Sequence, residues 1–341
     1  MNAAALLQSQ GLGAVRARDP HTAVRTAFAI QAQDVKGARL GVRARSEGLA
    51  AADVARACGA SERSLVRTWA MRSTLHMLPA EDVRWVVGLL GPLIARRGAR
   101  RRAELGLDDR ACARILDALP AVLAGGPLTR AEVVAGLAAR GARIDPDGQA
   151  PAHALLLAAA EGLVCRGPDG PRDAATYVLL DDWVAPEPAR DRDAALAELA
   201  RRHRAAYGPG DAGDLARWSG LPAADARRAW ALAGPPPPAP LTGDGPPPPR
   251  LLPAFDGALL GHRDRDPLLP PDVAVQVVAG PWIHPAVVAG GRVIGAWRRD
   301  DGTVRVRPIG ALPRGTRAGL RAEAEDVGRF LGVPTRLEVA A

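Results

Sequence analysis

The sequence predicts a mainly α-helical protein with β-structure: three tandem winged helix-turn-helix units, then a small C-terminal antiparallel β-element and a closing helix. Two observations support this fold class. A helix, a turn with glycine, a second helix and a short apolar strand are expected within residues 52–79, and a similar order recurs twice downstream. After residue 270 the pattern changes to short apolar runs separated by glycine turns. We therefore expect four parts, at residues 1–105, 106–185, 186–270 and 271–341.

The first predicted winged helix carries a set of side chains that can hold a phosphate backbone. Residues 52–58 have a helical pattern, Gly59 marks a turn, and a second helix is expected before a short β-type run that ends at Pro79. Because His76 alternates with apolar neighbours, we expect its side chain to point away from the core. Guanidinium, hydroxyl and imidazole groups are typical phosphate donors, so we expect contact with phosphate rather than catalysis. The donors are Arg63 and Arg67 on the expected helix, and Arg72, Thr74 and His76 after it.

The second predicted winged helix has the clearest local signals. Thr129 and Glu132 have the spacing of a capping box, which places a helix start there. Two β-type runs follow further on, joined by a segment rich in Gly and Pro that is typical of a wing hairpin. The expected elements are helices at 108–124, 129–140 and 151–162, and strands at 163–166 and 176–180.

The third predicted winged helix repeats the helical order, which ends at a proline-rich segment. Helices are expected at 194–206, at 211–218 and from Pro222 to 233, since proline favours the first turn of a helix. Residues 234–249 hold two runs of four prolines and cannot form a helix or a central strand. We interpret this segment as an extended, solvated insertion in a wing; a linker between unrelated domains is the alternative.

The C-terminal part reads as a small sheet closed by a helix. The expected strands are at 273–278, 286–288, 292–297 and 303–309, and the helix runs over 317–331 and ends at Gly332.

Composition limits the function classes. The 341 residues include 45 Lys+Arg against 37 Asp+Glu, a net charge of +8 that favours a polyanionic partner. All but one of the basic residues are arginine, so part of this excess reflects a compositional bias. The three cysteines and six histidines show no metal-ligand or disulfide spacing, and we expect no metal and no cofactor. No segment resembles a signal peptide or a membrane span, so we expect a cytoplasmic protein that contacts no membrane. We also expect a monomer.

A pair of glutamines is the strongest candidate for chemistry. Asp34 is suited to cap a helix over 35–45, so the residues just before it are expected to be extended. In an extended segment residues two apart share a face, which would project Gln31 and Gln33 together beside the helix N-terminus. The alternative is that both are ordinary polar residues that bridge two helices. Lys36, the sole lysine, is a further candidate, as a Schiff-base nucleophile, although a surface lysine is the default.

Three separated blocks, which span most of the chain, resemble the bacterial AlkZ-like DNA glycosylases. The blocks are Gln31-Ala32-Gln33-Asp34, the motifs within Leu65–Asp82 (Leu65-Val66-Arg67-Thr68-Trp69, Met71-Arg72-Ser73-Thr74-Leu75-His76 and Pro79-Ala80-Glu81-Asp82), and Leu252-Pro253-Ala254-Phe255-Asp256 with Leu260-Gly261-His262-Arg263-Asp264-Arg265. The resemblance implies a monofunctional enzyme that removes bulky or crosslinked N7-alkylpurines from double-stranded DNA. It also implies that a Gln-apolar-Gln motif, here Gln31 and Gln33, carries the catalysis; Ala32 is smaller than the apolar residue expected between them.

The resemblance further implies that the region after Asp256 forms a β-hairpin that approaches the DNA. His262, Arg263 and Arg265 would then be DNA contacts. The alternative is a salt-bridged loop in which Asp264 and Asp266 pair with the two arginines.

Two non-enzymatic functions compete with the glycosylase. Winged helices are mostly DNA readers, so a transcriptional regulator is one alternative, and a protein-interaction module is another. A DNA reader has no need of paired glutamines ahead of its first winged helix, and this favours the enzyme.

Overall fold

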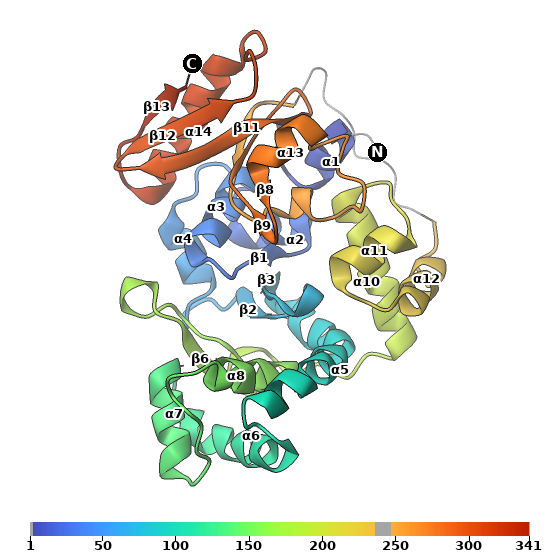
Figure 1. Ribbon diagram of the computed structural model, residues 1–341, viewed down its shortest axis with the longest axis vertical. Coiled ribbons are helices and arrows are strands. Elements are labelled where there is room, and N and C mark those ends of the chain that lie inside the picture. The colour runs from blue at the N-terminus through green and yellow to red at the C-terminus, as the bar shows by residue number, and fades with distance from the viewer. Residues whose placement is uncertain (1–2, 236–246, 341) are drawn as a thin grey trace. The chain divides into compact units, whose positions relative to one another are not determined.

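The computed structural model describes residues 3–235 and 247–340 (Figure 1). About half of these residues are helical, and the rest of the regular structure is β, so the fold is mixed. Most of the predicted proline-rich insertion, residues 236–246, lies outside the described residues.

The chain forms two compact units. The first comprises the described residues of Met1–Val54, Ala197–Trp218 and Pro222–Ala341, and the second comprises Ala55–Leu196 with Ser219–Leu221. Each unit is described by itself. The division into four parts at 105, 185 and 270 stays a prediction.

The second unit has helices around a small sheet in which strands follow the order β3, β2, β5, β6, β4. The capping box predicted at Thr129 and Glu132 is present at the start of α7, and the helices and strands predicted for 108–180 are confirmed. A close approach of α5 to α8 defines one side of the core, since a Cβ on Gly91 would lie 2.0 Å from the Ala160 carbonyl oxygen. The elements are α4 (Ala51–Ala57), β2 (Leu65–Trp69), β3 (Leu75–Pro79), α5 (Ala80–Glu104), α6 (Asp109–Leu123), β4 (Leu128–Thr129), α7 (Arg130–Ala139), α8 (Ala150–Ala160), β5 (Val164–Arg166), β6 (Thr176–Leu179) and α9 (Leu180–Trp183).

The prediction of a second helix after Gly59 is wrong. This segment forms the antiparallel hairpin β2–β3, in which Arg67 stands opposite Met77 and Thr68 opposite His76. Val66, Thr68 and Trp69 favour strands, and an apolar partner strand lies only a few residues away. A short turn, Met71–Ser73, joins the two strands.

The first unit begins with short helices and a two-residue strand and ends in a sheet with the order β13, β12, β11, β10, β7. Helices predicted at 194–206, 211–218 and 222–233 are confirmed. The elements are α1 (Ala3–Ser9), α2 (Pro20–Ala27), β1 (Ile30–Gln31), α3 (Val35–Arg45), α10 (Arg192–Tyr207), α11 (Ala212–Ser219), α12 (Ala223–Leu232), β7 (Arg250–Leu252), α13 (Pro271–Val277), β8 (Val278–Ala279), β9 (Trp282–Ile283), β10 (Ala286–Ala289), β11 (Arg292–Asp300), β12 (Thr303–Pro308), α14 (Thr316–Leu331) and β13 (Arg336–Val339).

The C-terminal sheet differs from the prediction at both ends. The strand expected at 273–278 is mostly helix α13, which has Pro271 in its first turn and buries Val273 and Val277, four residues apart, while Val275 is exposed. That spacing is the period of a helix. The sheet also gains two strands: β7 pairs with β10, and β13 pairs in parallel with β12. Helix α14 packs on one face of this sheet through Leu320, Ala324 and Val327 (Figure 1).

Candidate active site

The two glutamines share a face, as predicted. Gln31 ends strand β1, and its Nε2 donates a 2.7 Å hydrogen bond to Oε1 of Gln33. Ala32 between them is completely buried, so the chain alternates sides at each residue. A small residue is therefore accommodated against the core while both amides lie on the other side.

Helix α3 begins immediately after this pair. Asp34 caps it: Oδ1 accepts from the Lys36 amide and Oδ2 from the Gly37 amide, both at 3.1 Å. The predicted cap is thus confirmed, and it explains why the glutamines are extended. Lys36 lies exposed in the first turn.

The other end of α3 is fixed by a buried ion pair. Arg45 donates to both carboxylate oxygens of Asp256 at 2.8 Å, and each side chain is about 1% exposed. Nη2 of Arg45 also donates to Oε1 of Gln10 at 2.9 Å. Burial alone would lower the pKa of Arg45, but the charge of Asp256 and its hydrogen bonds outweigh burial and raise that pKa. The sequence block around Asp256 therefore locks the helix that follows the glutamines.

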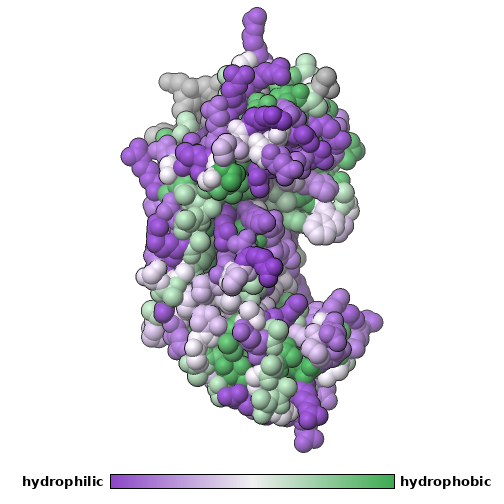
Figure 2. Space-filling view, turned by 90° about the vertical axis from the view of Figure 1, so that its left-hand side faces the viewer, coloured by the Kyte–Doolittle hydropathy of each residue, from purple (hydrophilic) through white to green (hydrophobic). Residues whose placement is uncertain are grey.

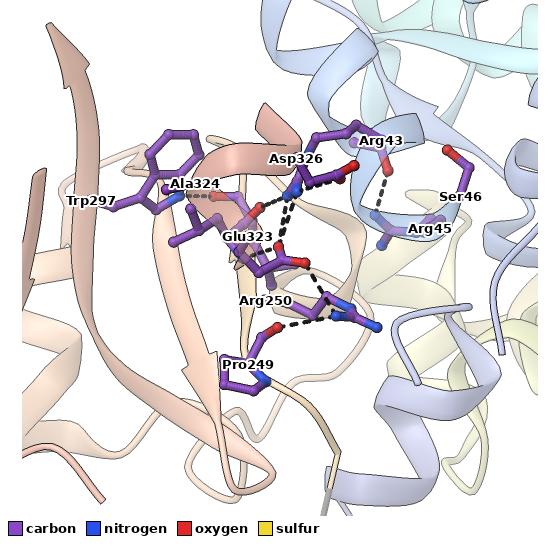
Figure 3. A network of polar contacts seen from close by, with 12 residues as sticks. Arg43, Arg45, Ser46, Pro249, Arg250, Trp297, Glu323, Ala324 and Asp326 are labelled. Atoms are coloured by element: carbon purple, nitrogen blue, oxygen red, sulfur yellow. Dashed lines mark hydrogen bonds and ion pairs between the residues drawn. The ribbon is translucent and has the colours of Figure 1, made fainter. Parts of the chain in front are cut away.

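A second buried network holds the same helix turn (Figure 3). Arg43 donates to Oε2 of Glu323 on α14 at 3.0 Å and to the Leu251 carbonyl of β7 at 2.7 Å. Arg250 donates to the other oxygen of Glu323 at 3.1 Å. One carboxylate thus joins α3, β7 and α14, with Asp326 completing the pairing of Arg43 at 3.2 Å.

A short hairpin beside the Asp256 block was not predicted. Strands β8 and β9 pair through Val278 and Ile283, and Trp282 on this hairpin is 60% exposed. Its ring lies 5.6 Å from that of Phe255, measured between centroids. The signal in the sequence was Gly280-Pro281 between two apolar pairs, which is typical of a turn. A hairpin was expected instead within residues 256–265, where the structure has a turn of 3₁₀ helix, Gly257–Leu259, followed by a loop.

The loop after Asp256 is tied to α11 by charge. Arg263 pairs with Asp211 at 2.6 Å, and its backbone amide donates to Asp214 at 2.9 Å. Asp264 instead accepts from the Asp266 amide, so the alternative in which Asp264 and Asp266 pair with Arg263 is replaced by a pairing with α11.

The three predicted DNA contacts of this loop differ in exposure. The His262 ring is 5% exposed, and burial lowers its pKa. Arg263 is exposed and Arg265 is half-buried. The same loop packs tightly on α10, because a Cβ on Gly261 would lie 2.0 Å from Cδ1 of Tyr207.

The predicted phosphate donors of the second unit are partly internal. Arg67 is 4% exposed and pairs with Asp169 at 2.7 Å, and His76 is 3% exposed, so its expected outward orientation is wrong. Their guanidinium and imidazole groups serve the core of the hairpin rather than its surface. Arg63 donates to the Asp182 carbonyl at 2.6 Å and is half-buried, as are Arg72 and Thr74.

Two buried imidazoles give the fold a defined pH dependence. Burial lowers the pKa of His76 to about 3, with Arg72 adding to the effect, and burial also lowers that of His203 to about 3, with His262 adding to it. Unfolded histidine titrates near 6.5, so between pH 6.5 and 3 the unfolded chain binds more protons. Stability is therefore lost as pH falls through this window, by up to about 1.4 kcal/mol per pH unit for each histidine.

This pH dependence can be tested by replacing one imidazole. His203→Phe keeps a ring against Tyr207, whose centroid is 4.9 Å from that of His203, and is expected to flatten the fall of the thermal midpoint between pH 6.5 and 4. His284→Phe at an exposed position is the matched control. Identical pH slopes in the wild type and His203→Phe would refute the assignment.

Within residues 3–235 and 247–340, no group of three or more His, Cys, Asp or Glu side chains could hold a metal ion. No described helix is both long enough and apolar enough to span a bilayer.

Comparison with known proteins decides the family. The family model described as "DNA glycosylase AlkZ-like" matches residues 24–330. The chain belongs to the AlkZ-like DNA glycosylase family. This match includes the glutamine pair, the β2–β3 hairpin and the Asp256 block, and it confirms the resemblance seen in the sequence.

Individual relatives agree with the family. An interstrand DNA cross-link repair glycosylase of Streptomyces sahachiroi is 30% identical over 359 residues, which cover 90% of this chain and 92% of the relative. The solved structure of Streptomyces sahachiroi DNA glycosylase AlkZ matches with a TM-score of 0.79 at 24% identity, over 99% of this chain and 98% of that one. The chain is thus an AlkZ-like DNA glycosylase with the AlkZ fold, a DNA-repair protein that acts on DNA.

Proposed function

We propose that this AlkZ-like glycosylase hydrolyses the N-glycosidic bond of bulky or crosslinked N7-alkylpurines in duplex DNA, and that Gln31 and Gln33 carry the reaction. The observation that supports this proposal is the 2.7 Å hydrogen bond that joins the two amides beside the start of α3. The Streptomyces sahachiroi relative described as an interstrand cross-link repair glycosylase supports the substrate class.

The chemistry suits neutral amides. A purine alkylated at N7 carries a positive charge and leaves readily, so little acid catalysis is needed. The remaining tasks are to hold a water near C1′ and to stabilise an oxocarbenium-like sugar. A carbonyl oxygen has two lone pairs, so Oε1 of Gln33 can accept from Gln31 and from a water together. The partial negative charge of the amide oxygen also favours a cationic sugar, without the cost of desolvating a carboxylate.

We propose that the helical regions of this protein are winged helices that contact the DNA. Helices α6, α7 and α8 with strands β4, β5 and β6 have the order of a winged helix, and we propose that the other two helical regions are diverged copies of it. Arg63, Arg72, Thr74, Arg263 and Arg265 remain proposed phosphate contacts. We also propose that the exposed Trp282 provides a surface on which a base can stack.

The proposal is tested by the products formed from a duplex that carries one N7-methylguanine. We expect free base and an unbroken strand with an abasic site, because water rather than an amine attacks the sugar. Borohydride should trap no protein–DNA adduct, and Lys36→Ala should release base at the wild-type rate. Strand cleavage or an adduct that depends on Lys36 would refute the monofunctional assignment. Tight duplex binding with no release from any N7-alkylated substrate would support the regulator instead.

A further inference from the structure

The region of the C-terminal sheet is rich in positive charge, as is the end of α5, where residues 96–102 contain five arginines and no acidic residue. Residues 286–321 contain eight arginines and two aspartates, a net charge of +6, whereas the whole chain carries +8. A compositional preference for arginine would spread this excess along the sequence. The clustering therefore needs a local reason in the C-terminal sheet.

Four of these arginines line one groove of the first unit. The groove has a volume of about 920 Å³, and its lining includes His284, Arg298, Arg305, Arg307, Arg317 and one acidic residue, Glu338. Arg298 on β11 stands directly opposite Arg305 on β12, and Arg307 follows two residues later on the same face. The other face of these strands carries Trp297, Val304 and Val306, which pack against α14. On the side shown in Figure 2, the surface over the C-terminal sheet is mostly hydrophilic.

The arginines of the groove are of two kinds. Arg298 and Arg305 are held by carboxylates: Arg298 pairs with Asp300 at 2.9 Å, and Arg305 pairs with Glu338 at 2.8 Å. Arg307 and Arg317 are exposed and pair with no carboxylate in the part of the chain that the structure describes. Their guanidinium groups are thus accessible to an outside anion.

The position of Arg317 does not favour stability. Arg298 and Arg305 stand opposite each other, but Asp300 pairs with both, at 2.9 and 3.2 Å, so their repulsion is offset. Arg317 lies in the first turn of α14, which contains no acidic residue, and a cation is unfavourable at that end of a helix. Binding of an outside anion would explain the position of Arg317, which the stability of the fold does not explain.

We propose that this C-terminal arginine groove binds the phosphodiester backbone of the duplex away from the base that is removed. The choice of DNA as occupant rests on the proposed function. Guanidinium groups bind phosphate through paired hydrogen bonds, and each neutralised phosphate releases counterions. The groove therefore contributes affinity and salt dependence, and takes no part in breaking the glycosidic bond.

The test compares charge-matched variants on undamaged duplex, so its outcome is independent of base release. Arg307→Gln/Arg317→Gln is expected to weaken binding and to reduce the slope of log K against log salt by about 2, at about 0.9 per phosphate. Arg18→Gln/Arg201→Gln removes the same charge from exposed arginines that already pair with Glu47 and Glu198. This control should change the slope little.

A structural role for the arginines is distinguished by stability. Arg317→Glu should weaken binding further without lowering the thermal midpoint, because an acidic side chain is favourable in the first turn of α14. An unchanged salt slope in the double variant, or an equal change in the control, would overturn the proposal. Unchanged duplex affinity with loss of binding to a polyglutamate peptide would also overturn it, in favour of an acidic protein partner.

Discussion

Gln31→Ala and Gln33→Ala are each expected to lower single-turnover base release by about 10²–10³-fold, the usual effect of losing one polar group that stabilises a transition state. Both amides lie on one face, and each substitution removes one partner of the 2.7 Å hydrogen bond. Duplex binding should stay near the wild-type value, since phosphate contacts supply most of the affinity. Release is measured with enzyme in excess over an N7-alkylguanine duplex.

The matched control for these substitutions is Gln149→Ala. Gln149 is an exposed glutamine that accepts a hydrogen bond from Arg101 at 3.0 Å, and its loss removes an amide without touching the proposed site. It should release base at the wild-type rate. If the Gln31→Ala/Gln33→Ala variant released base as fast as this control, the assignment of the pair would be wrong.

Asp256→Ala is expected to be strongly destabilising, by about 3–5 kcal/mol, because it leaves the buried guanidinium of Arg45 without its charge partner. Both side chains are about 1% exposed, so water cannot replace the lost carboxylate. The free energy of unfolding from urea titration measures the effect. Helix α3 would also lose the contact that fixes its far end, so base release should fall as well.

The comparison for this substitution is Arg263→Ala. It breaks the pair with Asp211, in which both side chains are 57% exposed, and should cost at most about 1 kcal/mol. Equal losses in the two variants would show that the buried pair contributes no more than an exposed one.

Local chemistry made the glutamine pair predictable. Asp34 is a helix cap whatever the rest of the fold does, and the residues before a cap are commonly extended, so the shared face followed from neighbouring residues alone. The buried partners of α3 could not be found in this way. Arg45 and Asp256 are separated by 211 positions, and nothing near Arg45 shows that it will be buried.

The errors have separate physical causes. Leu65–Trp69 was expected to be helical, yet β2 forms because an apolar strand partner is available a few residues on. Arg67 was expected at the surface, but Asp169, 102 residues away, allows its burial. For α13, alternating valines suggested a strand, although the proline and the aspartate ahead of them favour a helix start.

The most direct test of the central claim uses a duplex that carries a nitrogen-mustard crosslink between two N7-guanines. Wild-type protein and the Gln31→Ala/Gln33→Ala variant are incubated with it in excess, and strand separation, released base and duplex affinity are measured in parallel. We predict that the wild type unhooks the strands and releases alkylated base, and that the variant binds with similar affinity but leaves the crosslink intact. Binding without unhooking by the wild type, or equal unhooking by both proteins, would contradict the account.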